Sequence, residues 1–118
     1  MDSATPALDL LRSARKVGLV LSGGSARCSF QVGVIETLYE IGIDPALSVA
    51  VSGGVWNGAA VSIGAVPRLR QYWRAFTRMP HVDLRGLVRD HTPYRFAEMH
   101  RRTFGRYIGA ERLRGPEA

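Results

Sequence analysis

Two Ser-Gly-Gly turns lie thirty residues apart, in "LVLSGGSARC" at residues 19–28 and "VAVSGGVWNG" at residues 49–58. In the second turn, Ser52 stands between an apolar run and a small-residue segment, with Gly54 two positions later. That pattern is typical of a nucleophile elbow, in which a strained turn projects the serine hydroxyl beyond a sheet. The chemistry would be attack on an acyl carbonyl. The alternative is an ordinary helix N-cap serine in a glycine turn.

The first turn, Gly23–Gly24–Ser25, precedes a helical pattern and would present free backbone N–H groups. Such groups bind an anion, which is either a phosphate or the oxyanion that develops during acyl transfer. No Gly-Lys-Ser/Thr follows, and Asp44 precedes the second predicted strand rather than ending it, so no nucleotide-binding fingerprint fits. The oxyanion interpretation needs a nearby nucleophile, and Ser52 would supply it.

The elements that must position these turns are two strands and two helices. The apolar runs Lys16–Leu21 and Ala46–Ser52 predict buried parallel strands. A helix between them ends at Gly42, and a small-residue helix follows up to Gly64. The apolar face predicted for the first helix consists of Phe30, Val34, Leu38 and Ile41, widened by Val32, Ile35 and Tyr39. Because ligands gather beyond the carboxyl ends of parallel strands, both turns should share one site.

Residues 67–118 read as helices rich in arginine. One apolar face recurs with helical spacing up to Met79-Pro80, and Thr92-Pro93 predicts the cap and first position of a second helix. Both stripes are expected to be core contacts, and their members are Leu69, Tyr72, Trp73 and Phe76, then Phe96, Met99, Thr103 and Tyr107. The predicted organisation is therefore an N-terminal arm (1–15), a βαβα core (16–66) and a helical Arg-rich segment (67–118).

Charge is divided unevenly along the chain, which carries +6 in total. Residues 1–66 hold four basic and five acidic groups, whereas residues 67–118 hold twelve arginines and five acids, a net +7. The basic half is either a set of solvated helix faces or a surface for an anionic membrane. No recognition motif accompanies the arginines, so nucleic acid is not expected as a partner.

Several other classes of protein do not fit the composition. A single cysteine, Cys28, excludes an internal disulfide framework, and three histidines match no zinc spacing, so neither a metal nor another cofactor is expected. No apolar run reaches the ~18 residues of a transmembrane segment. The first residues do not read as a secretory signal, so a cytoplasmic location is expected, with peripheral membrane contact as the alternative.

Taken together, the motifs resemble the patatin-like phospholipase family. That family has an oxyanion turn G-G-G-x-R-G, a helix often reading Q-x-G-V, and an elbow G-x-S-x-G followed by A-x-N-G/A. This chain offers "GGSARC", "QVGVIETLYEIGI" and "AVSGGVWNGA" in that order. The stretch "HTPYRFAEMHRRTFGRYIGAERL" is similar to the region after the elbow in bacterial members. The resemblance covers about residues 17–113 and implies an incomplete three-layer α/β fold related to the α/β-hydrolases.

The resemblance also implies roles for individual residues. Ser52 would be the nucleophile of a hydrolase that cleaves ester bonds of lipids or phospholipids. The oxyanion turn would be Gly23, Gly24 and Ser25, with Arg27 supporting the loop, and the elbow would include Ala50, Gly53 and Gly54. Four positions carry more bulk than the family pattern, namely Ser25, Cys28, Ala50 and Val55. Cys28 is either a small buried substitute for glycine or, at a helix start, a reactive thiol.

The general base is the largest departure from the family. The family pairs its serine with an aspartate in a D-G-G or D-G-A motif, yet none of the five aspartates here precedes a glycine. A serine without a base is a poor nucleophile, so weak or absent activity is expected. Two explanations remain open. The chain is either the N-terminal part of a longer lipase domain or a protein that has lost catalysis, such as a module that binds anionic lipid surfaces through its Arg-rich half.

Overall fold

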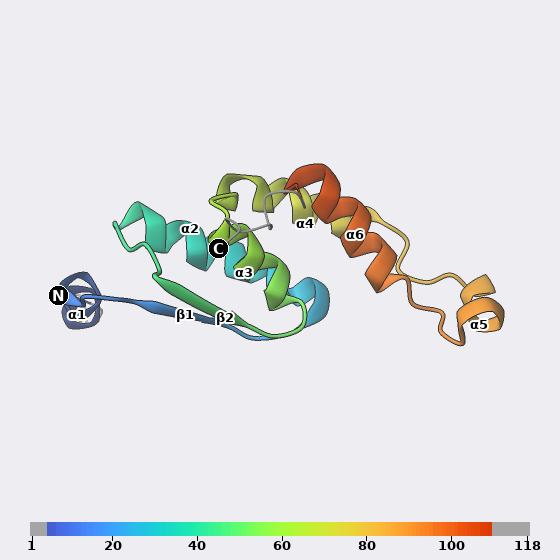
Figure 1. Cartoon of the computed structure of the whole chain (residues 1–118), viewed down its shortest axis with the longest axis horizontal. Coiled ribbons are helices and arrows are strands. Elements are labelled where there is room, and N and C mark those ends of the chain that lie inside the picture. The colour runs from blue at the N-terminus through green and yellow to red at the C-terminus, as the bar shows by residue number, and fades with distance from the viewer. Residues whose placement is uncertain (1–4, 110–118) are drawn as a thin grey trace, which may run out of the picture.

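The structure is a computed structural model that describes residues 5–109, shown in Figure 1. The ends of the predicted arm and of the Arg-rich segment, residues 1–4 and 110–118, lie outside the described residues. Its elements are α1 (Thr5–Ser13), β1 (Gly18–Leu21), the 3-10 helix η1 (Ser25–Phe30), α2 (Gln31–Glu40), β2 (Leu47–Ala50), α3 (Gly54–Ser62), the 3-10 helix η2 (Val66–Arg68), α4 (Leu69–Arg78), α5 (Arg85–Asp90) and α6 (Phe96–Tyr107). None of these helices is both long enough and apolar enough to span a bilayer.

Strands β1 and β2 form a parallel pair, with Gly18 opposite Leu47 and Leu21 opposite Ala50. Helix α2 makes the crossover, and α2 and α3 lie on the same side of the pair in Figure 1. The expected α/β class with a parallel βαβ unit is thus confirmed. A parallel pair also brings the carboxyl ends of both strands to one edge, and there the two Ser-Gly-Gly turns begin.

The prediction of fully buried strands is wrong for the described residues. Val20 is 79% exposed, Leu47 65% and Val49 53%. The helices cover one face of the pair, so alternate residues of each strand point to the uncovered face. Apolar runs predict burial on both faces only when layers lie on both sides, and residues 5–109 supply a layer on one side.

The core lies between the sheet and the helices that follow it. The predicted stripe of α4 is confirmed, because Leu69, Tyr72, Trp73 and Phe76 are all buried. The predicted face of α2 is wrong in part, since Phe30 is 67% and Val34 50% exposed. Val32 and Ile35, predicted to widen that face, are buried as expected, and together with Gln31 they form the inward side of the helix. The buried Gln31 fixes this orientation of the helix, because its Nε2 donates a hydrogen bond to the Ser22 carbonyl just beyond β1.

The predicted start of the last helix is also wrong, because α6 begins at Phe96 rather than at Pro93. Thr92 Oγ1 instead accepts a hydrogen bond from the Tyr94 N–H at 3.2 Å, which closes a local turn. Tyr94 then pairs with Val82 in an isolated antiparallel bridge, so the chain is extended where a helix was expected. The short helix α5, which no sequence pattern predicted, lies between these two segments.

His100 is the centre of the packing between α3, α4 and α6. Its ring stacks on Trp56 at a centroid distance of 4.4 Å and on Phe76 at 4.3 Å. Its Nδ1 is hydrogen-bonded to the hydroxyl of Tyr72, 2.5 Å away. Burial lowers the pKa of His100 from 6.5 to about 4 and raises the pKa of Tyr72. Both groups are therefore neutral at pH 7, and His100 serves the core rather than a proton relay to Ser52.

This burial makes the stability of the fold depend on pH. The folded-state pKa of His100 is below the unfolded value, so its contribution is intact above pH 6.5 and is lost as the pH falls towards 4. Between pH 7.5 and pH 5, urea unfolding should show a loss of about 2 kcal/mol. His100→Gln should abolish most of this loss, whereas His91→Asn, at an exposed position, should keep it. An unchanged loss in His100→Gln would assign the pH dependence to other groups.

Candidate active site

The two Ser-Gly-Gly turns are in direct contact. An ideal Cβ built on Gly23 would lie 2.9 Å from Ser52 Cβ and 3.6 Å from Ser52 Oγ. On the other side, a Cβ on Gly53 would lie 2.8 Å from the Ser25 carbonyl oxygen and 3.0 Å from Cys28 Sγ. Glycine is therefore required on both sides of the contact, and the turns form one constellation at the carboxyl edge of the strands.

The backbone at Ser52 is held in an unfavourable conformation. Ser52 has a φ of 53° and Ser25 a φ of 52°, in the left-handed region that residues other than glycine rarely occupy. Such a conformation costs about 1–3 kcal/mol and persists where the surroundings enforce it. Ser52 is exposed, and within residues 5–109 its hydroxyl makes no hydrogen bond. The side chain is thus presented to solvent at the edge of the sheet.

Backbone N–H groups surround this hydroxyl-bearing turn. Among residues 5–109, the N–H groups of Gly23, Gly24 and Ser25 donate no hydrogen bond to another backbone group, and neither does that of Gly53. Ser52 also precedes the first turn of α3, whose N-terminus carries a partial positive charge. Uncommitted donors and a helix N-terminus are the features that stabilise a developing oxyanion.

Small residues let α3 approach the strands. A Cβ on Gly54 would lie 2.7 Å from the Ser22 carbonyl oxygen, and one on Gly58 would lie 3.1 Å from Ala50 Cβ. The methyl of Ala50, where the family pattern has glycine, is therefore accommodated because Gly58 has no side chain. Val55, another bulkier position, is 44% exposed and crowds nothing in the described part of the chain.

A buried hydrogen-bond network joins the two turns to the helices. Asn57 is fully buried, and its Nδ2 donates to the Cys28 carbonyl at 2.9 Å and to Gln31 Oε1 at 2.8 Å. Its Oδ1 accepts from Trp73 Nε1 at 2.7 Å. Gln31 Nε2 in turn donates to the Ser22 carbonyl at 2.8 Å. Four elements, η1, α2, α3 and α4, are thus connected through a single amide side chain.

Gln31 and Asn57 belong to the two motifs that resemble the family, but the sequence alone predicted no role for either. The available signal was an amide side chain on a small-residue helix that packs closely on the sheet. Such a side chain is buried and must therefore have hydrogen-bond partners. Their partners could not be inferred, since Trp73 is sixteen residues from Asn57 and Cys28 is twenty-nine. Trp73 was predicted as a core residue, and its indole N–H also has this polar function.

Cys28 and Arg27 behave differently within the first turn. Cys28 is 1% exposed, and burial raises the pKa of its thiol, so the structure supports the small buried substitute over the reactive thiol. Arg27 is exposed on η1, and its Cβ would be 3.6 Å from a Cβ on Gly24. Its Cβ is therefore close to Gly24, while its guanidinium forms no ion pair among the described residues.

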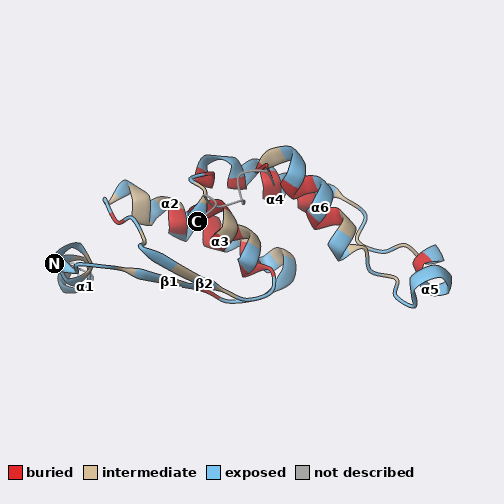
Figure 2. Cartoon of the chain, in the orientation of Figure 1, coloured by how far each residue is buried: buried red, intermediate tan, exposed pale blue. Residues whose placement is uncertain are grey.

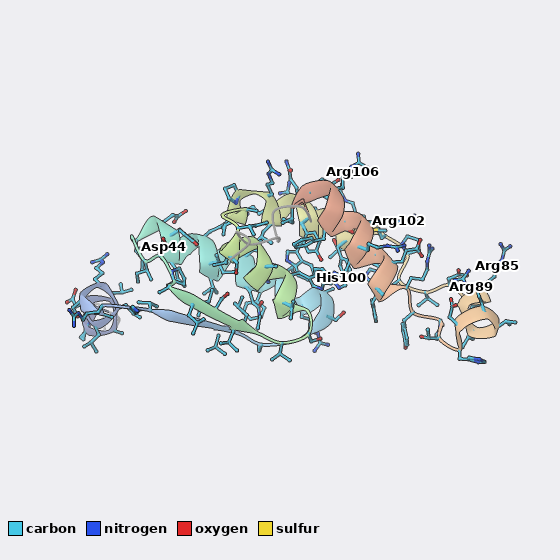
Figure 3. The ribbon with its side chains drawn as sticks, viewed as in Figure 1. Asp44, Arg85, Arg89, His100, Arg102 and Arg106 are labelled. Atoms are coloured by element: carbon cyan, nitrogen blue, oxygen red, sulfur yellow. The ribbon has the colours of Figure 1, made fainter. Side chains whose placement is uncertain are left out.

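No carboxylate of residues 5–109 is hydrogen-bonded to Ser52. Asp44 precedes β2 and so lies at the opposite end of the strands from Ser52; Figure 3 labels it beside α2. Asp90 is paired with Arg89 near α5, and Glu98 is paired with Arg95 and Arg102. Asp83 accepts a hydrogen bond from the Arg85 N–H. Asp2 lies outside the described residues. A general base for Ser52 is therefore missing from the described constellation.

The chain is also similar in sequence to known proteins. The family model described as patatin-like phospholipase matches residues 19–116, which include both turns. Lysophospholipase nte1 of Aspergillus terreus (strain NIH 2624 / FGSC A1156) is 53% identical over 45 residues, which make up 38% of this chain and 3% of the fungal protein. The match thus spans a small part of that relative's length. No solved structure matches the chain.

The contact between the turns predicts the effect of adding one methyl group. Gly23→Ala would place a methyl against Ser52 Cβ, which cannot yield without moving the turn, so the free energy of unfolding should fall by about 1–3 kcal/mol. Gly33→Ala, in α2 with nothing within 4 Å, should be neutral or stabilising by up to about 1 kcal/mol. Denaturant unfolding of both variants measures the difference. Equal stabilities would show that the two turns are not in contact.

Proposed function

Because the chain belongs to the patatin-like phospholipase family, a family of lipid hydrolases, we propose that its two Ser-Gly-Gly turns form the acyl-transfer site of a lipid ester hydrolase. The observation that carries this proposal is the contact of Gly23 with a Ser52 held at a φ of 53°. A serine strained in this way beside free N–H groups suits a nucleophile better than a helix cap, and Ser52 makes no cap hydrogen bond to α3.

In the proposed mechanism, Ser52 Oγ attacks the acyl carbonyl carbon of the substrate. The carbonyl oxygen becomes a tetrahedral oxyanion, which the N–H groups of Gly23, Gly24 and Ser25 stabilise. Collapse breaks the bond to the lipid alkoxide, which takes up the proton that Ser52 lost and leaves as the alcohol. The acyl ester left on Ser52 is then hydrolysed by water to the free acid and Ser52. Arg27, whose Cβ lies near Gly24, supports the oxyanion turn, and the glycines Gly53 and Gly54 allow the turns to meet.

The step that this chain performs poorly is removal of the proton from Ser52. No aspartate in the sequence stands in the D-G-G or D-G-A motif that supplies the base in this family. We expect the base to be a carboxylate contributed from outside the sequence given, so that the chain alone is weakly active or inactive. The arrangement of the turns does not require the base, because backbone geometry and the Asn57 network hold it.

The substrate class follows from the family and from the relative. The matching fungal protein is named a lysophospholipase, and 45 of its residues correspond to residues of this chain. We propose that the ester cleaved belongs to a phospholipid or a lysophospholipid. An exposed Ser52 beside exposed Val51 and Val55, which are 63% and 44% accessible, suits a substrate that brings its own apolar chain.

Labelling with a fluorophosphonate tests the acyl-transfer site. Intact mass should show one adduct that forms slowly at neutral pH and faster at alkaline pH, because hydroxide then replaces the missing base. Ser52→Ala should lose the adduct, and Ser62→Ala, at the far end of α3, should keep it. A folded protein that forms no Ser52 adduct at any pH would contradict the site. Rapid ester turnover at neutral pH that Ser52→Ala abolishes would contradict the missing base.

A second candidate function, contact with an anionic lipid surface, is favoured by the packing of α4 against α6. Two adjoining hollows of about 300 and 290 Å³ share Ala75 and Tyr107 and are rimmed by arginines. We call this set the arginine rim: Arg74, Arg78, Arg102 and Arg106. The Arg106 guanidinium lies 5.7 Å from the Tyr107 ring centroid, and only Arg102 has an acidic partner among the described residues. Guanidinium groups gathered around a hollow suit lipid phosphates.

Co-sedimentation with vesicles tests the arginine rim. Binding should increase when phosphatidylglycerol is added to phosphatidylcholine and should decrease at high salt. Arg74→Gln with Arg78→Gln should weaken binding to the anionic vesicles about thirtyfold, since each cation near the surface contributes about 1 kcal/mol. The matched control, Arg12→Gln with Arg15→Gln near α1, should bind like the parent. Binding that ignores both lipid charge and salt would exclude this function.

A further inference from the structure

Residues 80–95 form an arm that projects from the rest of the fold. Figure 1 shows α5 at one end of the long axis, separated from α4 and α6 by two extended connecting segments. The arm's stem is held by an antiparallel bridge between Val82 and Tyr94 and by hydrogen bonds from Asp83 N to Pro93 O (2.8 Å) and from Arg95 N to His81 O (3.3 Å). At its base, His81 packs edge-on against Phe76 of the core, 5.4 Å away.

The tip of the arm has a defined internal structure. Gly86 is buried there, and a Cβ at this position would lie 2.6 Å from the Thr92 carbonyl oxygen. The Gly86 N–H donates to Asp83 O at 2.9 Å, and the Leu87 N–H donates to Leu84 O at 3.2 Å. Helix α5 therefore packs on its own return segment, so its outward face is determined by the arm alone.

That outward face is apolar and uncovered. Leu84 is 71% exposed, Leu87 47% and Val88 88%, and Figure 2 shows most of α5 as exposed. Arg85 and Arg89 also come from α5, as Figure 3 shows, and Tyr94 on the stem is 57% exposed. Segments that lie at a bilayer interface typically combine exposed aliphatic side chains with arginine and tyrosine, as the tip of this arm does.

From this arrangement we propose that the arm inserts its tip into the interface of a lipid bilayer, with Leu84, Leu87 and Val88 among the acyl chains and Arg85 at the phosphates. Arg89 is paired with Asp90 at the edge of the tip. The proposal rests on the lipid-directed function proposed for the family site, but not on the chemistry of Ser52. It assigns a different element from the arginine rim and a different force, because the tip acts through apolar burial and the rim through charge.

A bilayer fits the tip better than a protein partner does. The tip is a convex projection with three aliphatic side chains, whereas a stable protein interface buries about 800 Å² on each partner. A bilayer interface accepts a small projection, since the acyl chains close around it. The charge of the chain, +6 in total and +7 over residues 67–118, complements an anionic lipid surface.

An environment-sensitive dye gives a direct readout of insertion. Cys28 is 1% exposed, so a cysteine introduced as Val88→Cys can be labelled selectively in the folded protein. On addition of phosphatidylcholine–phosphatidylglycerol vesicles, the dye emission should shift to the blue and should be quenched by brominated acyl chains. The same dye at Thr37→Cys, an exposed position on α2, should show neither effect. A dye at position 88 that stays in water while the protein binds vesicles would overturn the proposal.

Partitioning of an arm variant supplies the quantitative test. Leu84→Ser, Leu87→Ser and Val88→Ser combined should lower the vesicle partition coefficient about tenfold or more, and high salt should not restore equality with the parent. A control with Leu10→Ser and Val34→Ser, which are 72% and 50% exposed elsewhere, should partition like the parent. Unchanged partitioning of the arm variant would refute insertion, as would sedimentation showing that the tip instead joins two copies of the chain.

The two proposals fail separately in these experiments. Fluorophosphonate labelling of Ser52 without vesicles should be the same in the arm variant and the parent, because the arm does not contact the turns. Loss of labelling with normal partitioning would count against the acyl-transfer site alone. Normal labelling with unchanged partitioning of the arm variant would count against the arm alone.

Discussion

The buried amide of Asn57 is the interaction on which the arrangement of the two turns depends. Its nitrogen donates to the Cys28 carbonyl and to Gln31, and its oxygen accepts from Trp73. A primary amide can satisfy three partners in different directions at once, which no apolar side chain can do. The strands provide only four residues each. With so little sheet, polar connections from α3 to η1, α2 and α4 determine how the turns meet, and the apolar core only encloses them.

The geometry separates preorganisation from activation of the nucleophile. Backbone contacts and the Asn57 network place Ser52 beside Gly23 with a φ of 53°, so the frame of the proposed acyl-transfer site exists without a base. A base would have to approach from the open side of the turn, since the inner side is filled by Gly53 against Ser25 and Cys28. The proposed oxyanion donors are therefore present without a base. The only described histidine in the core, His100, is neutral and is hydrogen-bonded to Tyr72.

Two kinds of apolar surface are exposed, and they have different physical meanings. The uncovered sheet face, with Val20, Leu47 and Val49, is flat and bordered by unpaired strand edges, as in a sheet that further layers would cover. The tip of the arm is convex, isolated and mixed with arginine. Exposed apolar area alone would not distinguish them, but shape and neighbouring charge do.

Patterns local in the sequence determined much of this protein. The period of the apolar residues predicted α4 and its buried face. The short apolar runs predicted the two strands, and their order with a helix between them predicted the parallel pairing that brings the two Ser-Gly-Gly turns together. Helices and strands depend on neighbours within a turn or a strand, and the short helical connection between two strands favours their parallel pairing, so both can be predicted from the order of residues along the chain. Only the tertiary structure decided which face of α2 is buried, where α6 begins, which partners Asn57 has and where α5 projects. Each of these depends on contacts between residues distant in sequence, such as Gln31 with Ser22 and Val82 with Tyr94, whose hydrogen bonds outweigh local preference.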